Sequence, residues 1–303
     1  ILAPMVHDGS HFALSQNWVV NEVGTHVAPM FSASWTWKVQ HCIGHHAHIN
    51  VPERDPDLYH ASVLWRVHPG VQWSEAHSVQ GSTWPFQWIM ATLYMALERD
   101  FEHCYPSSFN NVASIDPRPA GSIWWMYELA RLGILLAIFG VVPHCTMCPR
   151  WRAFLVPFLI WLGFSTTFMA FSQVSHLDEE SVMGYDPQDF WNHTIATTQD
   201  WACGSSIAGY LSIGLNCQIV HHLFPTVHPC HYPYMQPLIE RILVRHGIHY
   251  RNAPSWWQAF SGYRASIEAL SRGEKTISLS TFYRDWVITL GEKLLRVTTR
   301  LIC

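Results

Sequence analysis

The chain has 303 residues, of which 49% are hydrophobic and only 13% are charged, and its formal net charge is −4. Such a chain lacks the basic surface that nucleic-acid binding requires, so no nucleic-acid partner is expected. Its 20 histidines outnumber the 18 lysines and arginines, and it carries 16 tryptophans and 15 phenylalanines. This composition indicates a chain rich in imidazole that meets a membrane interface, where aromatic side chains accumulate.

The first motif along the chain is His7-Asp8-Gly9-Ser10-His11. Residues four apart share one face of a helix, so His7 and His11 could bind one metal or flank two. Asp8 could accept a hydrogen bond from a ligand imidazole, as carboxylates behind metal ligands do. The next stretch, residues 12–37, is largely uncharged apart from Glu22, and we expect it to lie against a membrane.

The second motif is His41-Cys42-Ile43-Gly44-His45-His46. On a helix His41 and His45 share a face, whereas His46 points elsewhere, toward a second metal. Asp55 and Asp57 follow, and we regard them as poorer candidates than Asp8 for supporting an imidazole. Two further histidines, His68 and His77, lie in a loop-like stretch and are expected to be structural.

Two apolar segments, about 122–143 and 153–172, are long enough to span a membrane as helices. In the first, Glu128 and Arg131 are three residues apart and can pair on one helix face. A short loop joins the segments, which predicts an antiparallel hairpin; two buried helices of a soluble bundle are the alternative. Residues 84–97 are apolar but too short to span, and suit an interfacial or core helix.

A hairpin returns the chain to the side from which it started, so the histidines before residue 122 and after 172 can meet. The third motif is Gln218-Ile219-Val220-His221-His222, after an expected helix at 205–215. Imidazole suits zinc, copper, iron and nickel, and seven clustered histidines exceed what one zinc needs, which predicts two metals. Because the chain has no Glu-x-x-His motif, iron here would have an all-nitrogen ligand set.

The three motifs resemble the histidine boxes of membrane fatty acid desaturases: HDGSH at 7–11, HCIGHH at 41–46 and QIVHH at 218–222. Adjacent residues match as well, in QHCIGHHAHIN, in DPDL at 55–58 and in GLNCQIVHHLFP at 214–225. The resemblance implies an all-α integral membrane fold, with helical hairpins and a histidine-rich di-metal domain on the cytosolic side. Gln218 at the start of the third box is typical of the front-end group, which desaturates between an existing double bond and the carboxyl end.

The resemblance also implies a further ligand just after the last membrane helix, where FSQVSH ends in His176. The implied metal ligands are then eight histidines: His7, His11, His41, His45, His46, His176, His221 and His222. Gln218 would be a weak ligand or would stand behind the ligands, together with Asp8 and Asn216. Some relatives have Asn where this chain has Ser172, and His193 is a substitute candidate for the additional ligand.

For the chemistry, the resemblance implies two irons, O2 as co-substrate, and electrons from cytochrome b5 or a similar donor. The substrate would be a fatty acyl-CoA or an acyl-lipid held in an apolar channel, and the product a cis double bond. The location would be a membrane, that of the endoplasmic reticulum. Alternatives are a hydroxylase or ketolase on the same scaffold, a non-catalytic membrane metal-binding protein, and an inactive fragment.

The resemblance predicts a desaturase domain over residues 1–250 and a polar C-terminal tail of unknown role over 251–303. The family has a membrane hairpin before the first box, and front-end members often carry an N-terminal cytochrome b5 domain. Because the first box begins at residue 7, we interpret the chain as truncated at its N-terminus. Cys145 and Cys148 have CxxC spacing, but a single such pair predicts ordinary or redox-active thiols rather than zinc.

Overall fold

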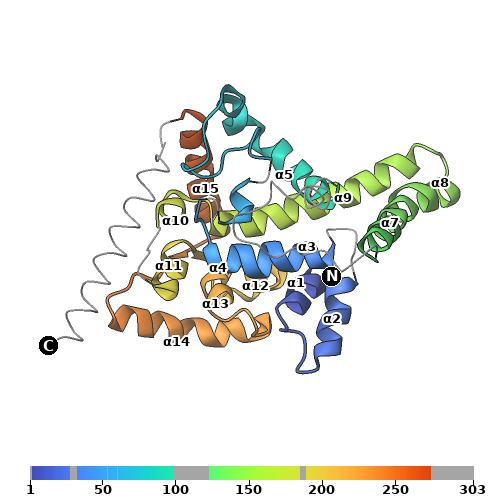
Figure 1. Ribbon diagram of the computed structural model, residues 1–303. Helices are drawn as coiled ribbons and strands as arrows, with labels where there is room; N and C mark the ends of the chain where they lie inside the picture. The colour runs from blue at the N-terminus through green and yellow to red at the C-terminus, as the bar shows by residue number, and fades with distance from the viewer. Residues whose placement is uncertain are drawn as a thin grey trace.

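The computed structural model of the protein describes residues 2–27, 33–52, 54–59, 61–97, 123–184 and 189–273. These residues are mostly helical, and their strands are limited to β1 (Asp200–Trp201) and β2 (Asn252–Ala253), which form one short parallel pair. The predicted all-α fold is thereby confirmed. Figure 1 shows a packed helical body from which α7, α8 and the adjoining end of α9 project to one side.

The N-terminal part consists of α1 (Leu2–Ser10) and α2 (Trp18–His26), which pack closely against each other. Gly9 permits this approach, because a Cβ there would lie 2.7 Å from Asn21 O and Thr25 N. A second stretch of continuous helix combines α3 (Ser34–Trp37), a π-helical segment (Lys38–His45) and α4 (His46–His48). The expected membrane-facing stretch contributes an exposed apolar face on α2, made of Trp18, Val19, Val20 and Val23.

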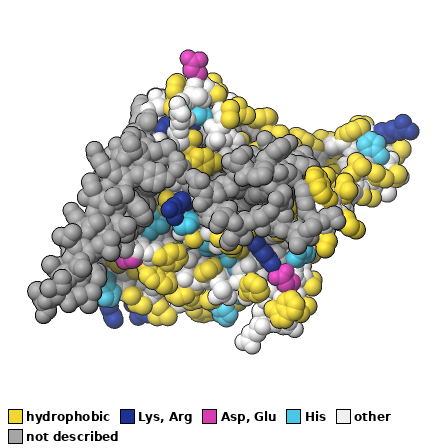
Figure 2. Space-filling model, in the orientation of Figure 1, with side chains coloured by type: hydrophobic (Ala, Val, Ile, Leu, Met, Phe, Trp, Pro, Cys, Tyr) yellow, Lys and Arg dark blue, Asp and Glu magenta, His cyan; other side chains and the backbone are white. Residues whose placement is uncertain are grey.

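The expected hairpin is formed by α7 (Ile123–Leu136), a π-helical turn (Ala137–Val141) and α8 (Val142–Thr146), which pack against α9 (Arg152–Ser172). Two stretches, Trp125–Thr146 and Arg152–Ser175, are long and apolar enough to cross a membrane. Only 11% of the apolar window of the first stretch and 17% of that of the second is buried in the part of the chain that the structure describes. Core helices of a soluble bundle would be mostly buried. Figure 2 shows the projecting end covered by hydrophobic side chains, with basic and histidine side chains at its tip.

The predicted pairing on α7 is present, because Arg131 Nε donates to Glu128 Oε2 over 2.9 Å and both residues are buried. At the hairpin tip Cys145 and Cys148 are exposed free thiols. Among the described residues neither belongs to a group of side chains close enough to share a metal.

The main core lies where α5 (Gln80–Leu97) and α15 (Trp256–Ser271) pack against the inner half of α9. Trp88 Nε1 donates to the Tyr263 hydroxyl over 2.9 Å, and Ser165 Oγ donates to the carbonyl of Trp88 over 2.6 Å. The helix expected at 84–97 therefore exists but begins at Gln80. The sequence predicts a polar tail from residue 251 onward, but in the structure this segment includes α15. The face of α15 formed by Ala259, Tyr263 and Ile267 is buried in the core. Residues 274–303 lie outside the described residues.

The last part of the body is a set of short helices around α13 (Gln218–Leu223), which carries the third box. A small core of Ile195, Ile219, Leu223 and Leu243 packs α13 between its neighbours. The helix expected at 205–215 is shorter and mostly exposed. The neighbouring helices are α10 (Glu179–Met183), α11 (Phe190–Ala196), α12 (Ser206–Ser212) and α14 (Tyr232–Arg245). The 3-10 turns are Pro56–Tyr59, Glu75–Val79, Gln173–Ser175 and Pro229–His231.

Candidate metal centre

The structure brings all eight histidines of the predicted ligand set into one cluster inside the helical body. They come from the end of α1, the π-helical segment with α4, the turn after α9, and α13. Neighbouring ring centroids are 4.2 to 5.1 Å apart at contacts such as His46–His222 and His45–His222. Seven of the eight residues are buried, and His7 is half-buried. Segments more than 200 residues apart in sequence thus meet at one point.

The cluster divides into two groups of ring nitrogens that lie within 4.8 Å of one another. We call His7, His11, His41 and His221 the first imidazole group, and His45, His176 and His222 the second imidazole group. His46 lies between them, because its ring nitrogen also groups with those of His221 and His222.

The π-helical segment explains why His46 joins the cluster instead of pointing away, as an α-helix would predict. The backbone N–H of His46 donates to the carbonyl of His41, five residues earlier. This wider turn places positions i+4 and i+5 on either side of position i, so His45 and His46 both flank His41. The ring of His46 accordingly lies 4.4 Å from that of His11 and 4.2 Å from that of His222. His46 is expected from the sequence to point toward a second metal, and its ring nitrogen groups with those of His221 and His222 and not with that of His41.

The geometry of the ring nitrogens fits bound metal ions. His7 Nε2 lies 3.2 Å from His221 Nε2, and His176 Nε2 lies 3.3 Å from His222 Nε2. Two nitrogens bound to one metal at about 2.1 Å are separated by about 3.0 to 3.4 Å, depending on the angle. Among the described residues, His11 Nε2, His41 Nε2 and both ring nitrogens of His46 are buried without a hydrogen-bond partner. Buried polar atoms without partners are costly, and metal coordination would satisfy them.

Burial keeps most of these imidazoles neutral, which is the form that binds metal. Burial, and then the neighbouring imidazoles, lower the pKa of His11, His41, His46, His221 and His222 well below the ordinary value. Burial, followed by His45, lowers the pKa of His176 to about 3. For His45, burial also lowers the pKa, but Asp55 and Asp57 outweigh it and raise the pKa to about 9. A metal bound to His45 would displace that proton.

Carboxylates stand behind one imidazole of each group. Asp8 Oδ1 lies 2.8 Å from His7 Nδ1, which is the contact expected from the sequence. Asp55, ranked as a poorer candidate, lies 3.1 Å from His45 Nδ1 through Oδ2 and is almost fully buried. Its two oxygens also accept from the backbone N–H groups of Asn50 and Asp57. Carboxylates in this position orient a ligand imidazole and make it more basic.

Sequence reasoning missed Asn50, which connects the second box to His176. The Asn50 side chain donates to the carbonyls of His176 and Ser181 over 2.8 and 3.2 Å. Asn50 adopts a left-handed backbone with φ of 55°, a conformation that Asn tolerates better than most residues. Next to His176, Gln218 Nε2 lies 3.1 Å from His176 Nε2. Gln218 thus contacts the second imidazole group, as expected for a residue that supports a ligand.

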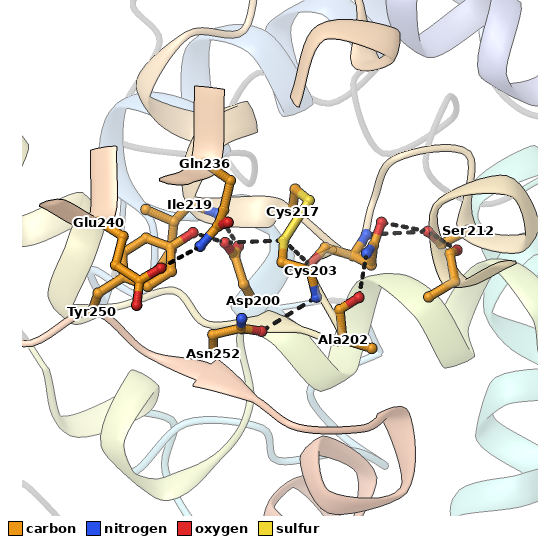
Figure 3. Close-up of a disulfide and its surroundings, with 12 residues drawn as sticks. Asp200, Ala202, Cys203, Ser212, Cys217, Ile219, Gln236, Glu240, Tyr250 and Asn252 are labelled. Atoms are coloured by element: carbon orange, nitrogen blue, oxygen red, sulfur yellow. Dashed lines mark hydrogen bonds between the residues drawn. A yellow bond between two sulfur atoms is a disulfide. The ribbon is translucent and has the colours of Figure 1, made fainter. Parts of the chain in front are cut away.

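The start of α13 is held by two connections that the sequence analysis did not anticipate (Figure 3). Cys217, the residue before α13, forms a disulfide with Cys203, and their Cα atoms are 5.8 Å apart. Asp200 Oδ1 accepts from the backbone N–H of Ile219 over 2.7 Å, and Asp200 also bonds the hydroxyl of Tyr250. Burial raises the pKa of Asp200 to about 7, although these hydrogen bonds lower it. Both connections fix the helix that presents His221 and His222.

Some predicted neighbours of the metal site lie elsewhere. Asn216 is buried, but its side chain bonds Ser212 Oγ and the carbonyl of Ala202, so its expected place behind the ligands is not supported. His193 Nε2 donates to the carbonyl of Ile49 over 2.7 Å and does not substitute for His176. Ser172 donates to the carbonyl of Phe168. The expected structural histidines make backbone hydrogen bonds, as seen for His68 with Gly70 and for His77 with Ser62.

A cavity of about 590 Å³ adjoins the cluster, within the range typical of small-molecule sites. Four histidines of the cluster, His7, His41, His45 and His176, are among its lining residues. The remaining wall is mainly apolar and comes from α5, α9 and the loop before α5. Apolar lining residues are Trp37, Leu58, Leu64, Trp65, Val67, Val79, Phe86, Met90, Leu93, Tyr94, Met95, Phe168, Met169, Leu177 and Leu215.

Residues 1–254 match the family model described as fatty acid desaturase. The match covers more than four fifths of the chain, and it includes all eight clustered histidines. The chain therefore belongs to the fatty acid desaturase family.

Individual relatives carry desaturase names. An acyl-lipid omega-13 desaturase of Chlamydomonas reinhardtii is 27% identical over 290 residues, covering 92% of this chain and 61% of that protein. An acyl-lipid (8-3)-desaturase of Mortierella alpina is 25% identical, covering 88% of this chain and 60% of that protein. An sn-1 linoleoyl-lipid 6-desaturase of Arthrospira platensis is 25% identical, covering 89% of this chain and 74% of that protein. The chain spans about three fifths of the length of the first two relatives.

Proposed function

We propose that this protein is a membrane acyl-chain desaturase that inserts a cis double bond by means of two histidine-bound irons and O2. The observation that carries the proposal is the convergence of eight imidazoles, from three boxes and His176, beside an apolar cavity. The first imidazole group would hold one iron and the second the other, with His46 between them. The all-nitrogen donor set suits iron, and the family membership favours it over the other imidazole-binding metals.

When bound, the two irons would supply O2 activation: O2, with two external electrons and two protons, would take one hydrogen from each of two adjacent carbons, giving the double bond and two waters. No acid–base side chain can attack an unactivated methylene, so the protein's own residues must position the substrate and the ligands. The cavity wall would bind the acyl chain by burying methylene groups, each worth about 0.8 kcal/mol. Because His7, His41, His45 and His176 line the cavity, a chain held there would lie beside the cluster.

The membrane assignment rests on the exposed apolar hairpin of α7, α8 and α9. With this hairpin in lipid, the histidine-bearing elements on both sides of it in the sequence would lie on one side, the cytosolic side. The exposed apolar face of α2 would rest on the same membrane surface. We also propose that this membrane is that of the endoplasmic reticulum, and that cytochrome b5 or a similar protein donates the electrons.

For the substrate, we propose an acyl-lipid rather than an acyl-CoA, because several relatives are named acyl-lipid or linoleoyl-lipid desaturases. We propose the front-end type because Gln218 occupies the first position of the third box and contacts His176. A front-end enzyme would add its double bond on the carboxyl side of an existing one.

The test is to express the gene that encodes this chain in yeast supplied with polyunsaturated fatty acids, and to identify new products by gas chromatography and mass spectrometry. We expect a new cis double bond in lipid-bound acyl chains, which a His45→Ala variant of equal membrane abundance does not form. Hydroxylated or oxygenated products would support the hydroxylase or ketolase alternative. Membrane-resident, metal-loaded protein without any lipid product would support a non-catalytic metal-binding protein.

A further inference from the structure

Tyr232, the first residue of α14, lies directly behind a histidine of the first imidazole group. Its side chain is buried, with a relative exposure of 2%, and its hydroxyl oxygen is 3.1 Å from His221 Nδ1. The other ring nitrogen of His221, Nε2, faces His7 Nε2 at 3.2 Å. His221 is therefore contacted from behind by a phenol and faces another imidazole in front.

The chain places Tyr232 there by a compact turn between α13 and α14. Phe224 and Val227 N–H groups donate to the carbonyls of Val220 and Phe224, and this turns the chain back at the end of α13. The turn Pro229–His231 then leads into α14. Cys217, Val220 and Tyr232 pack together in a small core, which fixes the tyrosine ring against α13.

A metal ligand that binds through Nε2 must carry its proton on Nδ1, and that N–H needs an acceptor. Asp8 is the acceptor for His7, and Asp55 is the acceptor for His45. For His221, the Nδ1 contact in the structure is the hydroxyl of Tyr232. A phenol oxygen can accept this N–H and hold the ring orientation without adding a negative charge near the metals.

We infer that Tyr232 is a positioning residue that holds His221 with Nε2 directed at the metal of the first imidazole group. The inference rests on the proposed function, because it requires a metal there. Tyr232 is not among the residues that line the cavity, so it acts through His221 and not on the substrate. Its loss should weaken retention of one of the two irons and leave the second imidazole group loaded.

The test compares Tyr232→Phe with Tyr263→Phe in the purified, detergent-solubilised protein. Tyr263 is equally buried and accepts a hydrogen bond from Trp88 Nε1, but it lies in the main core and does not line the cavity. Iron affinity is measured by competition with a chelator, and thermal unfolding is measured on the iron-stripped protein. Loss of a residue behind a metal ligand typically costs 10- to 100-fold in affinity, so we expect that loss for one iron in Tyr232→Phe. We expect wild-type iron affinity for Tyr263→Phe, and iron-stripped unfolding temperatures that are similar for the two variants.

A double-mutant cycle with His221→Ala makes the test specific, because contacting residues that act together are not additive. In the His221→Ala background, Tyr232→Phe should cause no further loss of iron affinity. Equal iron affinity for wild type and Tyr232→Phe, or a full additional loss in the His221→Ala background, would overturn the inference. The inference would also be overturned if protein with Tyr232→Phe were absent from the membrane in both the wild-type and the His221→Ala backgrounds, since Tyr232 would then be a structural residue. Wild-type protein that binds no iron would instead refute the proposed function itself.

Discussion

The two imidazole groups differ in how the chain supports them. In the first imidazole group, His7 is backed by Asp8, its neighbour in the same box, and His221 by Tyr232, eleven residues further along. In the second imidazole group, His45 is backed by Asp55, ten residues further along, but His176 is supported from distant segments. Asn50 bonds the carbonyl of His176, 126 residues away, and Gln218 contacts the His176 ring from 42 residues away. The groups thus differ at His176, whose supports come from far along the chain.

This difference shows why a motif reveals some supporting residues and hides others. Asp8 is visible as a candidate because it lies inside the box, next to the histidine that it contacts. Asp55 lies ten residues beyond His45, and its role depends on a turn that buries its carboxylate beside the ring. Gly44 contributes to this turn, since a Cβ there would lie 2.7 Å from the ring of Pro56.

The largest effect should follow from removing a ligand of the second imidazole group. His222→Ala deletes a nitrogen that groups both with His45 and His176 and with His46 and His221. We expect no detectable new double bonds, with the protein still present in the membrane because the apolar hairpin is intact. The matched control is His249→Ala, at an exposed position, which should retain wild-type product levels. Equal loss in both variants would indicate misfolding rather than damage to a site.

A smaller effect should distinguish the two supporting carboxylates. The buried carboxylate of Asp55 accepts hydrogen bonds from His45 and from two backbone N–H groups. Asp55→Asn replaces one of its oxygens by an amide NH2 group, which would then face at least one of these donors. We expect iron affinity and desaturation to fall about 10- to 100-fold. Asp8→Asn keeps an oxygen that can still accept a hydrogen bond from His7, so iron affinity and desaturation should fall by less than about 10-fold in this variant.

The measurement for both variants is product per unit of membrane-resident protein, together with iron content. Asp189→Asn serves as a control, because Asp189 is an exposed helix cap and Asn caps helices as well. Equal losses at Asp8 and Asp55 would contradict the expectation that the carboxylate with more hydrogen-bond donors matters more.

Gln218 provides the finest comparison, because its amide, and not an imidazole, contacts His176 at the start of the third box. Gln218→Ala should lower activity by about 10- to 100-fold, which is less than the loss of a ligand. Gln218→His should also lower activity, since the space beside His176 accommodates an amide that contacts a ligand 3.1 Å away. Product double bonds per membrane-resident protein decide the matter. Activity of Gln218→His at or above the wild-type level would remove the main local support for the front-end assignment.

Much of the architecture follows from patterns that are local in sequence. The apolar lengths of the two segments predict α7 to α9, and the three-residue spacing of Glu128 and Arg131 predicts their pair. Other features depend on the packed fold. The amphipathic α15 resembles a solvated tail by its charges, yet it buries Tyr263 in the core.

The candidate site divides in the same way. The boxes could be predicted because their residue types and spacing are distinctive, and His176 because the family resemblance implies a further ligand after the last membrane helix. The positions of Asn50, Tyr232 and the Cys203–Cys217 disulfide could not, because each depends on contacts between elements whose approach no spacing encodes. His46 joined the cluster through a π-helical turn, and α-helical spacing places it on another face.

The central claim is that the two imidazole groups hold two irons. The most direct test is the metal content of purified wild-type protein from iron-replete cells, measured by mass spectrometry with protein concentration from amino-acid analysis. With seven imidazoles in two groups and His46 between them, we predict about two irons per chain and no stoichiometric zinc. One zinc per chain without iron would contradict the di-iron account.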